Sequence, residues 1–415
     1  MIRKFLIVVF FLFSIASFAQ QGSASPYSFF GIGDVRYKGT HEINAMGGLS
    51  IVPDSIHINL QNPASYSSLK LTAFTIGGTF TTTKYKTNET TEKSQRATLD
   101  YLALAIPLKK FGAAMGLIPY STLGYKIKDV DNINNNIRRY NASGGLNKAF
   151  LGVGYQFNPS LRIGADFTYN FGKIETNNIN YQSAAQYGSQ ESNASDLSGF
   201  NLNFGVMYNK KINKKLDFYS AVTFTPESDL HSDNESKIFT IRYIGDLPPI
   251  PIDYLDTQYS NTTLKLPSKF SIGAGVGESK KWLLGTEVTF QGISSFVPRV
   301  STTSNVKYED AIKYTLGGYY IPNYNSFTSY FKKITYRAGL RYENTGLVIN
   351  NISINDYAFT GGLGMPVGGA FSNVNLGFEL GRRGTTTANL IEENYANIII
   401  SLSLNDKWFT KRKYD

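Results

Sequence analysis

Hydrophobic and polar residues alternate with a period of two along most of the chain, which is the pattern of a β-strand with one apolar and one polar face. In 161–171 the Leu, Ile, Ala, Phe and Tyr residues alternate with Arg, Gly, Asp, Thr and Asn, and 334–342, 374–381 and 397–404 follow the same rule. Many of these runs reach about ten residues, the length that crosses a bilayer at a tilt. A soluble β-sandwich shows the alternation but rarely so many strands of this length. The pattern therefore favours a transmembrane barrel.

Fourteen strands are predicted in this way, an even number as in single-chain bacterial barrels. Six short connections, such as 109–110 and 158–160, alternate with seven longer polar ones, such as 125–146, 173–196 and 226–268. Short periplasmic turns and long extracellular loops produce this rhythm in outer-membrane barrels. The strands are placed at 69–85, 96–108, 111–124, 147–157, 161–172, 197–209, 215–225, 269–277, 281–291, 311–320, 331–342, 357–367, 374–382 and 393–404.

The first residues indicate export. Arg3 and Lys4 precede an apolar run at 5–15, and Ser17 and Ala19 supply small residues at the minus-three and minus-one positions of a peptidase site. This order is typical of a secretory signal peptide, so we expect residues 1–19 to be removed. The apolar run is too short for the ~20 residues of a membrane-spanning helix, and no second apolar stretch of spanning length follows.

The segment 20–68 precedes the first strand and lacks its alternation. It holds eight Gly and Pro residues between Pro26 and Pro63 among many apolar residues, which makes it too apolar for a disordered tail. Fourteen strands enclose a lumen wider than an eight-stranded barrel, whose side chains fill the interior. We therefore expect residues 20–68 to form a hatch inside a barrel of residues 69–404, and residues 405–415 to form a periplasmic tail.

The amino-acid composition excludes several kinds of functional site. The sequence has no Cys, 28 Tyr, 28 Phe and only 17% charged residues, which suits long strands with aromatic girdles and rules out thiolate metal sites. The three histidines, His41, His57 and His231, have no metal-ligand spacing. We therefore expect no metal, no cofactor and no enzymatic activity.

The net charge of +10 becomes +8 once Arg3 and Lys4 are removed. The Lys and Arg residues are scattered along the sequence and no nucleic-acid-binding module is present, so nucleic acid is not an expected partner. Attraction to anionic lipid headgroups is the simpler interpretation.

Seven charged residues of the strands are expected to point into the lumen, because an Arg or Lys on the lipid face costs ~2–4 kcal/mol at the bilayer midplane. They either bind a carboxylate or latch the hatch, or they form ordinary lumenal ion pairs, and the latter is favoured. These residues are Arg162, Asp166, Glu287, Arg337, Arg341, Glu379 and Arg382.

Several short motifs occur in a fixed order along the chain: Ala45-Met46-Gly47-Gly48, Asn62-Pro63-Ala64, 151–155 turning into 161–165, Leu266-Pro267, 337–340 and 381–384. Their order and spacing resemble the FadL-type family of outer-membrane transporters of hydrophobic compounds. The resemblance covers essentially the whole mature chain and implies a fourteen-stranded barrel closed by an N-terminal hatch. The ending 408–413 resembles the Bacteroidetes branch, which also includes PorV-like proteins of type IX secretion.

Asn62, Pro63 and Ala64 are the expected hatch positions. Asn is a good N-cap and Pro a favoured first helical residue, so the motif predicts the start of a short helix that holds the hatch conformation. It departs from the family pattern in having Leu60-Gln61 before it.

The sequence thus predicts an outer-membrane channel, embedded in outer-membrane lipid and lipopolysaccharide, that admits a hydrophobic small molecule such as a long-chain fatty acid when the hatch rearranges. The alternative is a secretion-accessory or structural barrel that binds a protein partner.

Overall fold

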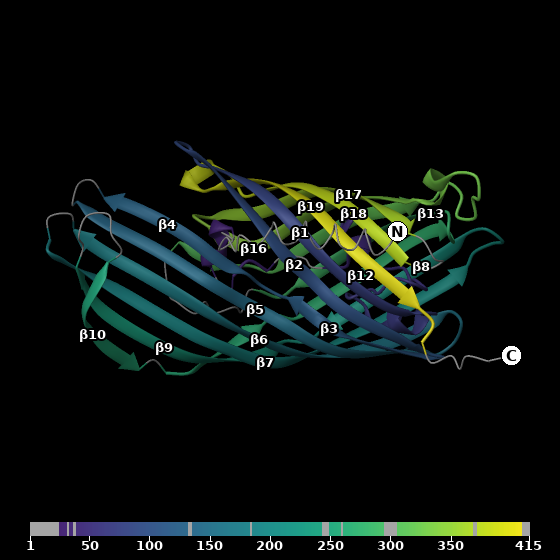
Figure 1. The fold of residues 1–415 in the computed structure, drawn as a ribbon, viewed down its shortest axis with the longest axis horizontal. Helices are drawn as coiled ribbons and strands as arrows, with labels where there is room; N and C mark the ends of the chain where they lie inside the picture. The colour runs from purple at the N-terminus through teal and green to yellow at the C-terminus, as the bar shows by residue number, and fades with distance from the viewer. Residues whose placement is uncertain are drawn as a thin grey trace, which may run out of the picture.

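The computed structural model describes residues 25–408 except 31–32, 36–38, 132–134, 183–184, 243–248, 259, 294–304 and 368–371. The predicted signal peptide and most of the predicted C-terminal tail lie outside the described residues. Within them, nineteen β-segments form one antiparallel sheet (Figure 1). They are β1 Thr72–Lys86, β2 Thr91–Leu108, β3 Phe111–Pro119, β4 Leu123–Asp131, β5 Asn136–Gln156, β6 Leu161–Gln182, β7 Tyr187–Lys211, β8 Asp217–Thr225, β9 Ser228–Arg242, β10 Ile250–Gln258, β11 Thr262–Leu266, β12 Lys269–Glu278, β13 Trp282–Gln291, β14 Val306–Tyr308, β15 Ala311–Tyr320, β16 Thr335–Ile349, β17 Ile352–Val367, β18 Ser372–Arg383 and β19 Glu392–Asp406.

The segments combine into fourteen barrel strands, because some of them are pieces of one interrupted strand. The pieces β3 and β4 pair in turn with β5, and β8 and β9 pair in turn with β7. In the same way β10, β11 and β12 run along β9 and β8, and β14 and β15 run along β16. The last strand pairs with the first from Thr72↔Asp406 to Lys86↔Glu392, which closes the barrel. The predicted all-β barrel of fourteen strands is confirmed.

The barrel wall has its apolar face outside. On β6, Ile163, Phe167, Tyr169 and Phe171 are exposed, whereas the polar residues Asp166, Thr168 and Asn170 between them are buried. A soluble protein buries its apolar side chains, so this inverted pattern marks a lipid-facing belt. Together with the closed hydrogen-bond ladder, the belt makes the protein an outer-membrane barrel.

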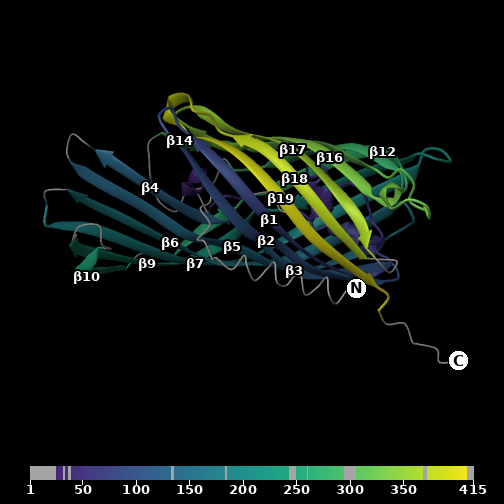
Figure 2. The same ribbon diagram turned by 45° about the horizontal axis from the view of Figure 1, so that its top comes forward.

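The three longest predicted loops are largely strand, which corrects the interpretation of 125–146, 173–196 and 226–268. The strands β5, β6 and β7 are 21, 22 and 25 residues long, about twice what a bilayer requires. Beyond the lipid belt they continue, with β4, β9 and β10, as a sheet that projects from one end of the barrel (Figures 1 and 2). Since short turns mark the periplasmic end, this projecting sheet is extracellular. It is rich in Asn, Ser and Thr, so the alternation that reveals membrane strands is absent from it.

The wall contains a local break in its ladder. Strand β2 pairs with β3 only over Leu102–Leu108, and β4 pairs with β5 alone. Among the described residues, the outer half of β2 therefore has a partner only in β1, and β4 has a partner on one edge only. The break lies at 120–122, where β3 ends before β4 begins.

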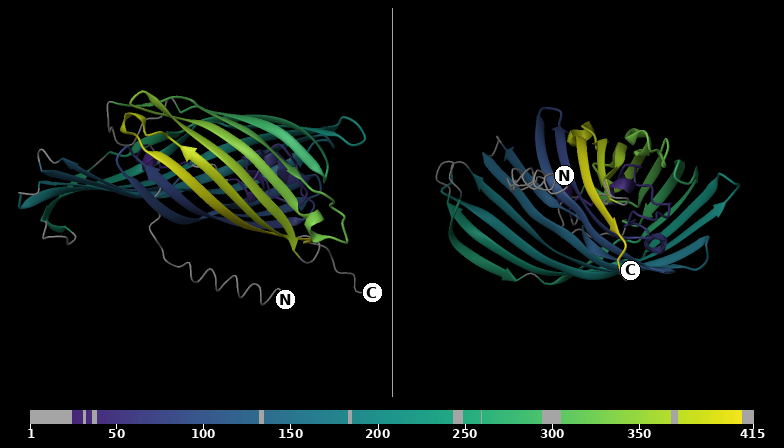
Figure 3. Two further views of the ribbon diagram at one scale, coloured as in Figure 1. Left: turned by 90° about the horizontal axis from the view of Figure 1, so that it is seen from above. Right: turned by 45° about the vertical axis from the view of Figure 1, so that its right-hand side comes forward.

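The described part of 25–71 lies inside the barrel, where it forms three short helices: η1 Pro26–Phe29, α2 His41–Asn44 and η2 Pro63–Ser68 (Figure 3). Tyr27 packs with Leu347 and Leu390 near the outer ends of β16 to β19, whereas Tyr66 packs with Ala105 and Ala114 near the inner ends of β2 and β3. This segment, called the hatch below, thus reaches from the extracellular end to the periplasmic end. No helix of the described residues has the length and apolar character to cross a membrane.

Candidate functional site in the barrel lumen

The lower part of the hatch is docked on the wall through Asn62. Its Oδ1 accepts a hydrogen bond from the Ala64 amide at 3.0 Å, so Asn62 caps η2 and Pro63 is its first residue, as the motif predicts. Its Nδ2 also donates to the carbonyls of Val206 and Val222 at 3.2 and 3.4 Å. A Cβ on Gly205 would lie 2.1 Å from Asn62 Oδ1, so this close approach requires glycine in the wall. Asn62 therefore has two roles: it caps η2, and it docks the hatch on the wall.

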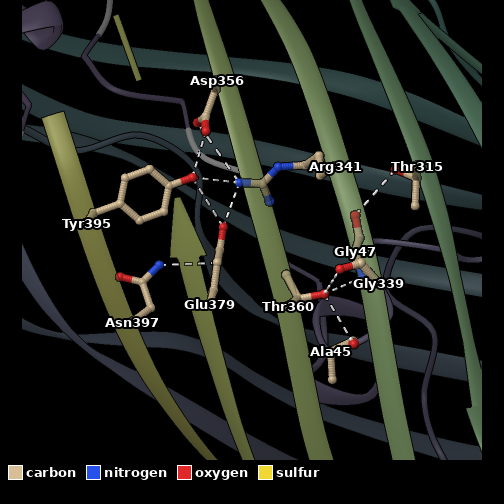
Figure 4. A network of polar contacts seen from close by, with 10 residues as sticks. All are labelled: Ala45, Gly47, Thr315, Gly339, Arg341, Asp356, Thr360, Glu379, Tyr395 and Asn397. Carbon is tan, nitrogen blue, oxygen red and sulfur yellow. Dashed lines mark hydrogen bonds and ion pairs between the residues drawn. The ribbon is translucent and has the colours of Figure 1, made fainter. Parts of the chain in front are cut away.

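The middle of the hatch is held by hydroxyl groups of the wall (Figure 4). Thr360 Oγ1 accepts from the Gly47 amide at 2.9 Å, and Thr315 Oγ1 donates to the Gly47 carbonyl at 3.3 Å. The neighbouring Ser50 donates its amide and its hydroxyl to Glu287 Oε2, at 2.9 and 2.8 Å. These bonds satisfy buried polar groups of a segment that has little regular structure.

The outer part of the hatch spans the break in the wall. The amide of Asp34 donates to the Thr122 carbonyl at 2.8 Å, and the Thr122 amide donates to the Asp34 carbonyl at 3.2 Å. The Asp34 carboxylate pairs with Arg383 of β18 at 2.6 Å. One hatch residue thus ties the β3–β4 junction to a strand on the other side of the break.

Six of the seven predicted lumenal charges lie on the inner side of the wall. Glu287 binds the hatch directly, and Asp166 does so through Asn203, whose Nδ2 donates to Asp166 at 3.2 Å and to the Gln61 carbonyl at 3.3 Å. Arg337 lies beside the hatch, where its charge acts on Glu42. Arg162 is half-buried and hydrogen-bonds Asn209.

The pair of Arg341 and Glu379 is an ordinary lumenal ion pair with a network around it. Their side chains are 2.6 Å apart, and Tyr395 donates its hydroxyl to Asp356 at 2.7 Å beside them. Figure 4 shows the four side chains converging from β16 to β19. They line a polar cavity of about 70 Å³, which has room for water rather than for an apolar ligand.

The seventh charge, Arg382, is placed wrongly by the sequence interpretation. It lies on the outer side of β18, is exposed, and pairs with Glu392 at 2.6 Å. The alternation of Val374, Leu376, Phe378 and Leu380 assigns position 382 to their face, so the lumenal residue is Arg383. At the extracellular end an outward arginine meets water, where the cost of charge near the lipid is small.

A larger cavity of about 190 Å³ lies between the hatch and the wall. Three lysines line it, Lys148 of β5, Lys269 of β12 and Lys313 of β15, and Lys148 Nζ lies 3.8 Å from the ring centroid of Tyr120. The apolar part of the lining includes Leu60, Ile118, Phe150 and Leu266. Asp166 and Glu343 are its acidic residues, so cations outnumber carboxylates. The cavity therefore combines an apolar wall with three lysines and two carboxylates, a lining that suits an anionic group.

The sequence interpretation missed these lysines although the signal was present. In 311–320, Lys313 alternates with Ile312 and Tyr314 in the same way as the predicted lumenal charges. Lys148 and Lys269 are the second and the first residue of predicted strands, where few preceding residues of the alternation help to assign their side.

A cluster of titratable side chains, Glu42, Asp54 and His57, holds its part of the hatch against the wall. His57 Nδ1 lies 2.8 Å from Asp54 Oδ2, and His57 Nε2 lies 3.2 Å from Asn373 Nδ2 of the wall. Asn375 donates to Glu42 at 2.9 Å, and Glu42 Oε1 is 3.8 Å from the His57 ring. The described residues contain no group of His, Cys, Asp and Glu side chains suited to a metal.

The charged groups in this cluster shift one another's pKa values. Burial lowers the pKa of His57, but the carboxylates of Asp54 and Glu42 outweigh it and the pKa is raised. Burial likewise raises the pKa of Asp54 and of Glu42, but His57, with Arg337 beside Glu42, outweighs it and both pKa values are lowered. His41 differs: burial dominates and lowers its pKa to about 4, so its ring is neutral.

Comparison with known proteins finds one matching family by sequence and several solved structures of similar fold. The sequence profile of a family described as BamG matches residues 1–415. No curated protein sequence matches the chain.

Solved structures match at the level of fold. The Ralstonia pickettii toluene transporter TbuX has 14% identity and a TM-score of 0.60, over 88% of this chain and 97% of that one. The Pseudomonas putida toluene transporter TodX has 16% identity and a TM-score of 0.60, over 91% and 100%. A Pseudomonas aeruginosa FadL homologue has 11% identity and a TM-score of 0.54, over 89% and 98%. The FadL-type fold inferred from the motifs is therefore confirmed.

Asn62→Ala tests the docking of the lower hatch. The change removes one cap and two bonds to the wall, so we expect local stability of 59–68 to fall by about 1–3 kcal/mol. Hydrogen exchange of these amides measures the loss, while the barrel strands stay protected. Asn158→Ala is the control, because Asn158 accepts from the Ser160 and Leu161 amides in a turn outside the lumen. Equal exchange in 59–68 for both variants would contradict the docking role.

The pKa shifts predict a pH optimum for hatch docking. The raised pKa of His57 stabilises docking below its ordinary 6.5, and this stabilisation is lost as the pH rises through the folded-state value. The lowered values of Asp54 and Glu42 stabilise docking above their ordinary values, and this is lost as the pH falls through the folded-state values. Exchange of 41–58, corrected for intrinsic rates, should be slowest between about pH 5 and 6.5. His57→Gln should remove the loss on the alkaline side and His231→Gln should not.

Proposed function

Since the chain belongs to the BamG family, whose profile covers it entirely, and folds like known outer-membrane channels, we propose that it is a channel for hydrophobic small molecules. Two of the fold relatives are toluene transporters and a third is a FadL homologue. The single observation that carries the proposal is the cavity lined by Lys148, Lys269 and Lys313, because it lies in the lumen and combines an apolar lining with positive charge.

The chemistry of that cavity supports an amphipathic substrate with an anionic head, such as a long-chain fatty acid. The three ammonium groups suit a carboxylate, and the apolar side chains opposite them suit the adjoining methylene groups. The three lysines distinguish this lining from one suited to an uncharged hydrocarbon. Phe150 and Ile118 provide apolar contacts at the wall, and Leu60 provides one from the hatch itself.

The size of the cavity supports gating by the hatch. An engineered protein cavity of about 150 Å³ holds one benzene molecule, so about 190 Å³ holds the head and the first methylene groups of a fatty acid. A whole acyl chain requires more room. The hatch lies in the lumen beside this cavity, and Asn62, Pro63 and Ala64 fix its lower part, so we infer that passage requires the hatch to move.

The break between β2 and β4 supports a route through the wall. An acyl chain leaving the cavity passes Ile118, which lies just before the break. The bridge between Asp34 and Thr122 closes this place in the described conformation. In this proposal, displacement of the outer hatch opens a path for the apolar part of the substrate into the lipid.

Lys148→Gln, Lys269→Gln and Lys313→Gln together test the substrate class. Loss of charge-assisted hydrogen bonds to a carboxylate should lower uptake of a labelled long-chain fatty acid by about 10-fold or more, because such bonds contribute ~1.5–3 kcal/mol each. Uptake of an uncharged aromatic tracer should change little. The matched control replaces Lys84, Lys86 and Lys93 of the outer strands by Gln. Uptake is compared at equal surface levels, and fatty-acid uptake that survives complete removal of the protein would contradict the channel.

We propose as a second candidate that the projecting sheet binds a protein partner, which is the role of a secretion-accessory or structural barrel. One observation favours it: β10 exposes Ile250, Ile252, Tyr254 and Leu255 outside the lipid belt. Apolar side chains gathered there have no membrane to cover them. A PorV-like role in the Bacteroidetes branch is one form of this candidate.

Replacing 178–191 by Asn-Gly tests the second candidate. This change shortens β6 and β7 beyond the lipid belt and removes support from β9, so a partner that binds the projecting sheet should be lost from gently purified material. The barrel should still form, because the membrane-crossing parts of both strands remain. Deletion of the outer tip 87–90 is the control. A partner retained by both variants would exclude the projecting sheet as its binding surface, whereas fatty-acid uptake tests the channel separately.

A further inference from the structure

Lysines are concentrated at the periplasmic end of the barrel, at the turns between its strands. Four of these turns, 109–110, 210–216, 279–281 and 321–334, contain no Asp or Glu. Glu278, which directly precedes the third turn, pairs with Lys281 at 3.1 Å. We call the lysines of these four turns the lysine rim. Its ten members, of which all but Lys333 are exposed, are Lys109, Lys110, Lys210, Lys211, Lys214, Lys215, Lys280, Lys281, Lys332 and Lys333.

In the part of the extracellular end that the structure describes, no such excess of one charge is found. The outer hairpin 84–93 carries Lys84, Lys86 and Lys93 together with Glu89 and Glu92. On the projecting sheet, β9 combines acidic and basic residues, and the pairs Lys237–Glu235 and Lys265–Glu227 are formed there. The basic surplus of the sequence is therefore not scattered in space, because much of it lies at one end of the barrel.

Two members of the rim occupy backbone positions that do not suit lysine. Lys109 has φ of +60° and Lys280 has φ of +61°. Tight turns normally place Gly or Asn in this left-handed region, because a longer side chain is strained there. At the outer end, Asn350, Asn351 and Asn389 follow that rule, whereas Ala388 with φ of +54° does not. The backbone conformation therefore does not select lysine at these two positions, so its charge or its side-chain contacts do.

The rim lies at the height of lipid headgroups. Lys109 and Lys110 stand between Leu108 and Phe111, which are exposed on the lipid-facing side, and Lys211 precedes the exposed Ile212. Lysine stems can lie along such apolar surface while the ammonium groups reach the polar layer.

Aromatic rings accompany the lysines in the longest of these turns. Lys280 Nζ lies 4.6 Å from the ring centroid of Tyr324, and Lys333 Nζ lies 5.6 Å from that of Phe327. Phe327 is 97% exposed and Phe331 is 71% exposed. Exposed aromatic and basic side chains beside a lipid belt are typical of the membrane interface.

We propose that the lysine rim binds the anionic headgroups of phospholipids in the inner leaflet of the outer membrane. The interaction does not depend on what passes through the lumen. Each lysine near an anionic surface adds electrostatic attraction, and ten of them around several turns form a distributed surface rather than a single pocket. An acidic protein would cover one side of the periplasmic end, whereas lipid reaches every turn at the height where the rim lies. The rim would thereby fix the depth and the sidedness of the barrel.

Native mass spectrometry of the full protein tests the proposal. The protein is taken from vesicles of equal parts phosphatidylglycerol and phosphatidylcholine, and the lipids retained are counted. The wild type should retain phosphatidylglycerol in preference, and high salt during extraction should reduce the preference. Lys109→Asn with Lys280→Asn should lower retention of phosphatidylglycerol about fivefold or more, the effect expected for the loss of one or two lysines at an anionic surface. The control replaces Lys84, Lys86, Lys93 and Lys126 of the outer end by Gln and should keep the preference.

The same double variant separates lipid binding from a role in the turns. Because Asn is suited to the left-handed region, the variant should unfold at a higher temperature than the wild type in detergent, while it retains less phosphatidylglycerol. Higher stability with unchanged lipid retention would overturn the proposal. Equal retention of the two lipids by the wild type would overturn it as well, and so would a preference that only the outer-end variant loses.

Discussion

Close contact between the hatch main chain and the glycines of the inner wall is the interaction on which the lumen depends. A Cβ on Gly164 would lie 2.5 Å from the carbonyl carbon of Pro63, and one on Gly339 would lie 2.2 Å from that of Met46. At this distance, wall residues can satisfy polar groups of a segment with little helix or strand of its own. Thr360 and Glu287 do so for Gly47 and Ser50. The cavity beside Lys148 exists because the hatch is held where these contacts place it.

The fold was predictable because lipid and lumen impose opposite demands on neighbouring residues. Every membrane-crossing strand carries this alternation, so all fourteen were found from the sequence. The projecting sheet was not, because both of its faces meet water and nothing enforces a period of two. In β7, residues 187–196 are polar almost throughout, and their strand character follows from pairing with β6 and β9. Long-range pairing of this kind leaves no local signal in the sequence.

The candidate site was predictable only in part, for a related reason. Alternation assigns Asp166, Glu287 and Arg341 to the lumen, but it does not say which of them meet the hatch and which pair with each other. Applied strictly, it also assigns Arg383 rather than Arg382 to the inner side. The cap formed by Asn62 was foreseeable from local chemistry. Its bonds to Val206 and Val222 were not, because they join positions far apart in the sequence.

The polar character of the lumen bears on how a channel of this kind works. Paired charged and polar side chains line the space around Arg341 and Glu379, so an apolar molecule gains nothing by entering it. Apolar surface in the lumen is available mainly where hatch and wall meet, as at Leu60 and Phe150. A hydrophobic substrate must therefore follow the surface of the hatch rather than an open pore. The contacts that hold the hatch in place then also define the path of the substrate. Any movement that frees the hatch changes these contacts and the path together.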